Sequence, residues 1–243
     1  MKRYISNRGQ AMTRPRVLLI IPCYNEASSI ATLLEEISSC PQNYATIVID
    51  DNSVDNTAAI ADKFSPVVRL VRNLGIGGAM QTGFKYAFEH DFDFCVQIDG
   101  DGQHPPHEVA KLLMHYQQHH KSITIGSRYI DNDSFRSTWA RRMGSKMIAG
   151  TLNFLFRHCQ VSDPTSGMRL MDRQAIAFFA KRYPHDYPEP ISLAWAFKQG
   201  LSVGETPVRM RAREHGQSSI FGMKSVAYMF RVLGYVLLAR FIY

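Results

Sequence analysis

The chain has 243 residues, 45% hydrophobic and 20% charged, enough to bury the core of one large domain or two small ones. Its net charge of +7 is uneven, because residues 1–133 hold 12 Lys and Arg against 15 Asp and Glu, whereas residues 134–243 hold 16 against 6. The sequence has no zinc-finger spacing, RNA-binding aromatic signature or lysine-rich tail, which argues against nucleic acid and favours phosphorylated small molecules or an anionic membrane as partners. Four scattered cysteines and a polar N-terminus favour a reducing cytoplasm.

The first half of the chain repeats the order strand, loop, helix four times. Apolar runs alternate with segments of helical spacing, and a fifth strand follows at 122–129. The four strands are expected at 16–21, 45–50, 67–73 and 92–99, and the helices after them at 27–38, 58–64, 80–90 and 107–118. This order predicts an α/β fold with a mainly parallel sheet and helices on both faces. A basic, methionine-containing helix is then expected within 136–156.

The loops after the first two strands carry polar and aromatic side chains. Tyr24 and Glu26 lie in PCYNE, and Asp50 and Asp51 end the second strand. In open sheets ligands bind beyond the carboxyl ends of the strands, where a ring stacks on a base and a carboxylate accepts hydrogen bonds from base or ribose. Capping of the following helix or loop by these residues is the alternative.

The loop NLGIGGAMQTG places Gly75, Gly77 and Gly78 before a helix, as in a dinucleotide-binding fingerprint. The match fails because Met80 occupies the position of the third glycine and the loop follows the third strand instead of the first. Nicotinamide binding is therefore not expected. The glycines are still expected to let the backbone approach a phosphate or sugar closely.

In the segment CVQIDGDGQHPP, an expected strand is followed directly by Asp99 and Asp101. The two carboxylates, about 6–7 Å apart, repel each other unless a cation lies between them. Gln103 adds a third oxygen, which suits Mg²⁺ or Mn²⁺ shared with a diphosphate. A solvated turn is the alternative. His104 and His107 are expected to be exposed loop and helix-entry residues, because hard cations prefer oxygen.

Seven motifs, in order, resemble family 2 glycosyltransferases of GT-A fold, closest to dolichol- or polyprenyl-phosphate sugar synthases. They are PCYNE, DDNSVDNT, RNLGIGGAMQTGF, QIDGDGQHPP, IGSRY, DPTSGMR and VRMRAREHGQSS. The resemblance covers about residues 15–220. It implies an inverting, metal-dependent transfer of a sugar from a UDP- or GDP-sugar to a polyprenyl-phosphate or polyprenyl-linked acceptor in glycan or cell-envelope biosynthesis.

The resemblance also implies roles for individual residues. Asp101 and Arg213 would stabilise the departing nucleoside diphosphate, and Arg141 and Ser145 would lie on one helix face. An ordinary solvated or membrane-facing charge is the alternative for Arg141. By this resemblance, the nucleoside would be bound by Pro22, Tyr24, Glu26 and Asp51, and the cation and sugar diphosphate by Asp99, Asp101 and Gln103. The donor phosphates would be bound by Arg213, and the acceptor phosphate by Arg128, Arg141 and Ser145.

The nature of the acceptor decides whether a catalytic base is needed. A lipid phosphate is already anionic, whereas a sugar hydroxyl must lose a proton. Relatives that use hydroxyl acceptors commonly place a Glu-Asp pair before the last core helix, where this chain reads HDYPEPISLAW. Glu189 is the candidate base, and a loop carboxylate restrained by Pro188 and Pro190 is the alternative.

The expected organisation is a flexible N-terminus (1–14), a glycosyltransferase domain (15–220) and a C-terminal helix (221–243). The domain would divide into a nucleotide-sugar half (15–133) and an acceptor half (134–220). Arg231 and Arg240 interrupt the apolar C-terminal segment, which favours a helix on an anionic membrane surface or a membrane-protein partner over a spanning helix.

A core helix or a contact between copies of the chain is the alternative for this C-terminal segment. The expected location is cytoplasmic, peripheral on the inner face of the plasma membrane. Two other functions remain open, a nucleotidyltransferase and a non-catalytic nucleotide-sugar-binding protein.

Overall fold

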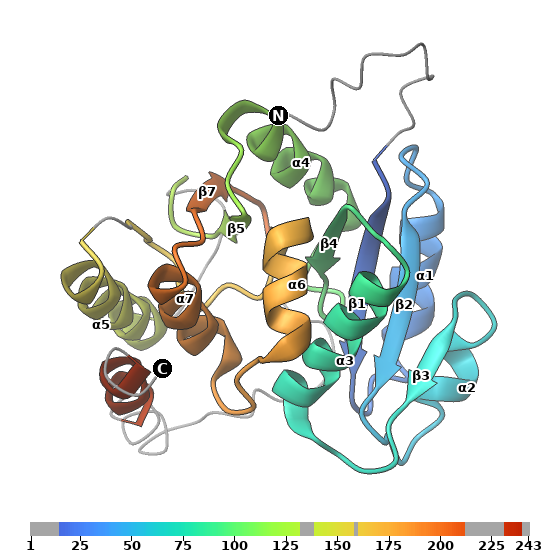
Figure 1. Cartoon of the computed structure of the whole chain (residues 1–243). Coiled ribbons are helices and arrows are strands. Elements are labelled where there is room, and N and C mark those ends of the chain that lie inside the picture. The colour runs from blue at the N-terminus through green and yellow to red at the C-terminus, as the bar shows by residue number, and fades with distance from the viewer. Residues whose placement is uncertain (1–14, 132–138, 158–159, 212–230, 240–243) are drawn as a thin grey trace.

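A computed structural model describes residues 15–131, 139–157, 160–211 and 231–239 (Figure 1). The strands are β1 (Val17–Cys23), β2 (Ala45–Asp50), β3 (Val67–Arg69), β4 (Phe94–Gln97), β5 (Ile123–Ser127), β6 (Arg169–Asp172) and β7 (Val203–Pro207). The helices are α1 (Ile30–Ser38), α2 (Thr57–Ala61), α3 (Gly75–Glu89), the 3₁₀ turn η1 (Pro106–Glu108), α4 (Val109–His119), α5 (Trp139–Leu155), α6 (Arg173–Lys181) and α7 (Pro188–Lys198). Residues 231–239 are also helical.

The described strands form one seven-stranded sheet in the order β3-β2-β1-β4-β6-β5-β7. All neighbouring pairs are parallel except β4 with β6 and β5 with β6, so only β6 runs against the others. The predicted α/β fold with a mainly parallel sheet is confirmed. Strands β6 and β7 come from the second half of the chain, which therefore completes the sheet begun by the first half.

Both faces of the sheet are covered, which explains why β1 is a continuous apolar run. Leu18 and Ile20 point into one core cluster, which α3 and α6 share. Leu19 and Ile21 point into a second cluster with residues of α1 and α4. Because the sheet is closed on both sides, the polar loops at its carboxyl edge are where ligands have access.

One expectation changes at this level. The glycine segment is not a loop, because α3 begins at Gly75, and a Cβ on Gly77 would lie 2.3 Å from the Pro184 carbonyl oxygen. Gly77 therefore serves close packing within the protein instead of phosphate approach. Of the predicted C-terminal helix, the structure describes only residues 231–239. Within the described parts of the chain, no helix has the length and apolarity needed to span a bilayer.

Candidate active site

The loops after β1 and β2 are bonded to each other. The Asp51 N–H donates to the Cys23 carbonyl oxygen at 2.8 Å, and the Glu26 N–H donates to Thr57 Oγ1 at 2.8 Å. The ring of Tyr24 is exposed beside them. The structure thus brings the candidate nucleoside-binding residues of the two loops to one corner of the sheet.

The two aspartates at the end of β2 have different environments. Asp50 is fully buried, and its carboxylate lies 3.3 Å from Arg69 Nε. Asp51 Oδ1 accepts a 2.7 Å hydrogen bond from the Leu74 N–H at the start of α3. Burial raises the pKa of Asp51, and the backbone hydrogen bonds of Leu74 and Gly75 oppose that rise. Asp50 therefore stabilises the fold through its ion pair with Arg69, whereas Asp51 holds the N-terminus of α3 next to the candidate nucleoside site.

The glycine between the two aspartates of the DGD motif is required by packing. A Cβ on Gly100 would lie 2.5 Å from Cys23 Sγ and 3.3 Å from the Pro22 carbonyl oxygen, both at the end of β1. Ser29 Oγ, at the start of α1, donates to the Gly100 carbonyl oxygen at 2.8 Å. The DGD loop is thereby held directly against the PCYNE loop.

Asp99 is oriented by two buried polar neighbours. Gln97 Nε2 donates to Asp99 Oδ1 at 3.1 Å, and the Asp99 N–H donates to His104 Nδ1 at 3.0 Å. His104 Nε2 lies 3.7 Å from Asp99 Oδ2. The prediction that His104 is exposed is wrong: the residue is 3% exposed because Gly167 packs against its ring, whereas His107 is exposed as expected.

Asp101 and Gln103 close the same loop. The Gln103 N–H donates to Asp101 Oδ1 at 3.0 Å, and Gln103 pairs with Arg211, whose N–H donates to the Gln103 carbonyl oxygen at 3.0 Å. Arg211 is itself fixed by Glu36, whose carboxylate oxygens lie 2.8 and 2.9 Å from Nη1. Arg213 lies outside the described residues, two positions beyond this anchor.

The oxygens of this loop suit a hard divalent cation. The described residues contain no cluster of three or more His, Cys, Asp or Glu that could enclose a metal. Two carboxylates and one amide oxygen leave the remaining positions to water and diphosphate oxygens, as Mg²⁺ and Mn²⁺ prefer. The side-chain oxygen of Gln97, beside Asp99, is buried without a hydrogen-bond partner in the described structure, so a donor such as water is expected there.

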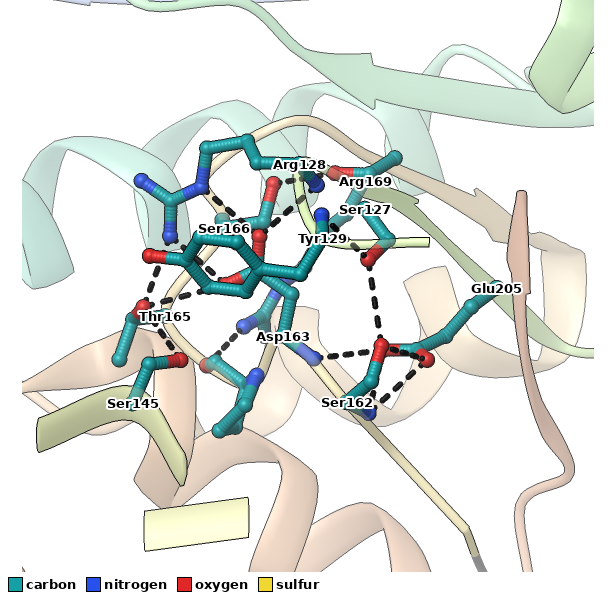
Figure 2. Close-up of polar contacts among 12 residues, drawn as sticks. Ser127, Arg128, Tyr129, Ser145, Ser162, Asp163, Thr165, Ser166, Arg169 and Glu205 are labelled. Carbon is teal, nitrogen blue, oxygen red and sulfur yellow. Dashed lines mark hydrogen bonds and ion pairs between the residues drawn. The ribbon is translucent and has the colours of Figure 1, made fainter. Parts of the chain in front are cut away.

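A buried ion pair anchors the candidate acceptor residues (Figure 2). Arg128 Nε and Nη2 donate to the two carboxylate oxygens of Asp163, each at 2.7 Å, and Nη2 also donates to Thr165 Oγ1 at 2.8 Å. Thr165 Oγ1 lies 3.3 Å from Ser145 Oγ of α5. Burial lowers the pKa of Arg128, but the hydrogen bonds and charge of Asp163 outweigh it, so the pKa is raised.

The structure joins Arg128 and Ser145 through partners that sequence reasoning missed. The carboxylate of Glu205 on β7 accepts from the Asp163 N–H at 2.9 Å and so fixes the loop that holds the pair (Figure 2). The only sequence signal for Asp163 and Thr165 was the DPTSGMR motif itself. Arg141 belongs to α5, but its side chain is outside the described part of the structure.

The Tyr129 ring lies within cation–π range of two arginines. Arg128 Cζ is 5.3 Å from the ring centroid, and Arg142 Cζ of α5 is 5.7 Å from it. The ring therefore connects the loop after β5 with the basic side of α5.

One loop connects the acceptor candidates with the DGD motif. Residues 163–167 carry Asp163 and Thr165 at one end and Gly167 at the other. A Cβ on Gly167 would lie 3.1 Å from Asp99 Oδ2 and 3.2 Å from Gln97 Nε2. A side chain at this position would crowd the Asp99 carboxylate, so the loop lies closely against it, and the Arg128 network lies beside the candidate metal loop.

Glu189 lies in the first turn of α7, next to the same loop. Arg169 ties the two together, because its Nη2 donates to the Pro164 carbonyl oxygen at 2.7 Å and its Nη1 to the Glu189 carbonyl oxygen at 2.8 Å. Burial raises the pKa of the Glu189 carboxyl, and Asp99 raises it further, whereas Arg169 lowers it. Glu189 is therefore a helix residue whose carboxyl interacts electrostatically with Asp99, and not the loop carboxylate restrained by Pro188 and Pro190 that was the alternative.

Carboxylates from three strand ends lie beside a buried arginine network on this sheet, and comparison with known proteins assigns the chain to the glycosyltransferases of GT-A fold. A solved structure, glucosyl-3-phosphoglycerate synthase from Mycobacterium tuberculosis with Mn²⁺, UDP and glucosyl-3-phosphoglycerate, superposes with a TM-score of 0.69 at 20% identity. The match covers 93% of this chain and 80% of that one. It establishes the shared fold.

The chain belongs to glycosyl transferase family 2, whose sequence profile matches residues 18–178. It is 30% identical to polyprenol monophosphomannose synthase of Mycolicibacterium smegmatis over 239 residues, 91% of this chain and 88% of that protein. It is 28% identical over 223 residues to UDP-N-acetylglucosamine–dolichyl-phosphate N-acetylglucosaminyltransferase of Methanococcus voltae, covering 83% and 88% of the two chains. The predicted family and enzyme class are confirmed.

Proposed function

We propose that this glycosyltransferase moves a sugar, with inversion, from a UDP- or GDP-sugar to a polyprenyl phosphate in glycan or cell-envelope biosynthesis. The names of two relatives support this acceptor class, because the mycobacterial protein is named for making polyprenol monophosphomannose and the archaeal one for transfer that involves dolichyl phosphate. The observation that carries the proposal is the 163–167 loop, which touches Asp99 through Gly167 and Arg128 through Asp163. Donor and acceptor groups would therefore meet across one short loop.

The donor would bind along the strand ends of β1, β2 and β4. Tyr24 would stack on the base, and Glu26 and Asp51 would accept hydrogen bonds from base or ribose, with Pro22 forming the floor. Asp99, Asp101 and Gln103 would hold Mg²⁺ or Mn²⁺, which would offset the charge on the departing diphosphate. Arg213, two residues beyond the Arg211 anchor, would reach the donor phosphates.

The acceptor phosphate would bind at Arg128, Ser145 and Arg141, with Thr165 between the first two. A phosphate oxygen attacks the anomeric carbon from the side opposite the diphosphate. The bond from that carbon to the diphosphate oxygen breaks, its electron pair leaves with the nucleotide, and the configuration inverts. Because the attacking oxygen is already anionic, no proton has to be removed.

Glu189 is the base in a second version of the reaction, with a sugar hydroxyl on a polyprenyl-linked acceptor. Its raised pKa and its position near Asp99 favour that role. In either version the donor site would come from residues 15–133 with Arg213 added, and the acceptor site from residues 134–220 with Arg128 added. Both versions also place the enzyme at the cytoplasmic face of the membrane that holds the lipid.

The test is transfer of radiolabelled sugar from a panel of UDP- and GDP-sugars to a short-chain polyprenyl phosphate. Replacing Arg128 by Gln should raise the acceptor KM far more than the donor KM. Arg173→Gln is the matched control, because Arg173 makes an exposed pair with Asp91 at the other end of the sheet. If the acceptor KM of the Arg128 variant is unchanged, or if no nucleotide sugar yields a lipid-linked product, the proposal fails.

A further inference from the structure

Helix α4 ends in a turn that is rich in histidine. His115 and His119 are four residues apart, so both rings lie on one face of α4. Their ring centroids are 4.5 Å apart, and the ring planes meet at 45°. His115 is half-buried, and His119 is exposed. Two histidines with this spacing on a helix can bind one metal ion between them.

The ring of His115 is held by the two strands next to α4. Its Nδ1 lies 3.4 Å from the hydroxyl of Thr124, a fully buried residue of β5. A Cβ on Gly204 of β7 would lie 2.5 Å from Cε1 of the ring and 2.9 Å from Cγ of Lys121, so both side chains pack directly on the β7 backbone. Because Thr124 engages Nδ1, Nε2 is the ring nitrogen that can bind a metal.

The charges around the pair favour a neutral His115 ring, as a metal ligand must be. Burial lowers the pKa of His115 below its ordinary 6.5, and the charges of His119 and Lys121 lower it further. Lys111, one turn earlier on α4, is paired with Glu108, whose carboxylate lies 2.7 Å from Nζ. Lys121 therefore keeps the ring unprotonated, but its charge also opposes the approach of a cation.

We infer that His115 and His119 form a binding site for one divalent transition-metal ion, such as Zn²⁺ or Ni²⁺. Imidazole suits these ions, whereas Mg²⁺ prefers oxygen ligands. The described residues add no third His, Cys, Asp or Glu to the pair, so water completes the coordination. The two rings lie in the last two turns of α4, an 11-residue helix about 16 Å long that begins soon after the DGD loop. This site is therefore separate from the candidate site for Mg²⁺ or Mn²⁺.

A bound ion restrains the end of α4. One of its ligands, His115, is packed on β5 and β7, and the other, His119, belongs to the final turn of the helix. The two rings are neighbours only while α4 is folded, so the ion stabilises the folded chain. Neither histidine takes part in the proposed sugar transfer, and the inference does not rest on that function.

The test is isothermal titration of the full chain with ZnCl₂ and, separately, with NiCl₂, at neutral pH in excess Mg²⁺. Wild type should show a binding event that weakens about tenfold or more in His115→Gln and in His119→Gln, since losing even a hydrogen-bond partner of a metal ligand weakens binding about 10–100-fold. His120→Asn is the matched control and should bind as wild type. His120 is exposed at φ 49°, which Asn tolerates, and its ring packs on Tyr116.

Two further variants keep both histidines and test the geometry. Gly204→Ala should displace the His115 ring from β7 and weaken the same event. Lys121→Gln removes a positive charge beside the ring and should tighten it. Metal binding that is absent in wild type, or unchanged in both histidine variants, would overturn the inference. The titration uses neither nucleotide sugar nor acceptor, so a failure of the proposed transfer reaction would leave its result unchanged.

Discussion

The Arg128–Asp163 pair gives the sharpest stability prediction. Asp163 is fully buried and accepts hydrogen bonds from the Arg128 backbone and guanidinium and from Thr165 Oγ1. Asp163→Ala would leave a guanidinium that is 18% exposed without its counter-charge. Removing one partner of a buried pair costs about 3–5 kcal/mol, and partial water access to Arg128 favours the lower end, about 3 kcal/mol.

That loss can be measured by urea and thermal unfolding. For a domain of this size about 3 kcal/mol corresponds to a Tm lower by about 6–12 °C. Arg211→Gln, which breaks the exposed pair with Glu36, is the control and should change the free energy of unfolding by less than about 1 kcal/mol. Replacing both members of the buried pair, by Arg128→Met and Asp163→Leu, should recover most of the stability, because no charge is then left buried alone.

The double variant also separates stability from function. It should fold but bind the acceptor poorly, while binding nucleotide sugar as wild type does. If Asp163→Ala lowers the free energy of unfolding by less than about 1 kcal/mol, or if the double variant is no more stable than Asp163→Ala, the reasoning about this pair is wrong.

Two further predictions concern Glu189 and His104. The pKa of Glu189 is raised in the folded protein, so the protonated carboxyl stabilises the fold below its usual pKa of 4.5, and this stability is lost as the pH rises from 4.5 through the raised pKa. Glu189→Gln should therefore raise Tm at pH 7 and flatten that loss in a plot of Tm against pH. Transfer to a lipid phosphate should survive this change, whereas a loss of about 10²–10⁴ in kcat would identify a base and a hydroxyl acceptor. His104→Phe leaves the Asp99 N–H without its acceptor and should cost about 1–3 kcal/mol of folding free energy and weaken Mn²⁺ binding, measured by paramagnetic resonance. His104→Asn, which restores an acceptor, should recover both, and equal Mn²⁺ affinity in all three proteins would refute the positioning role.

Much of the fold follows from local patterns in the sequence. The β1 run is apolar on both sides, and the Asp and Gly clusters after the strands mark where each strand ends, so the positions of the first strands along the chain and the carboxyl edge were predictable, whereas the order of the strands in the sheet was not predicted. The start of α3 was not, because Gly75, Gly77 and Gly78 have low helix propensity. Tertiary packing of Gly77 against the Pro184 segment overrides that preference.

The motifs that form the candidate site could be predicted from the sequence, but the side chains that pair with them could not. Asp99, Asp101 and Gln103 stand within one short motif, so their proximity needed no tertiary information. The Arg128–Asp163 pair joins residues 35 positions apart, so no local sequence pattern predicts it. The burial of His104 likewise depends on the 163–167 loop, since a Cβ on Gly167 would lie 3.2 Å from the His104 ring.

Nucleotide binding to the intact chain, followed by thermal unfolding with and without Mn²⁺, tests the donor site most directly. A UDP- or GDP-sugar at about 100 times its Kd should stabilise wild type by about 2.7 kcal/mol when Mn²⁺ is present. Chelation of the metal, or Asp101→Ala, should abolish most of that gain. Stabilisation of equal size in chelator, or in the Asp101 variant, would contradict a metal-bridged donor diphosphate at the DGD loop.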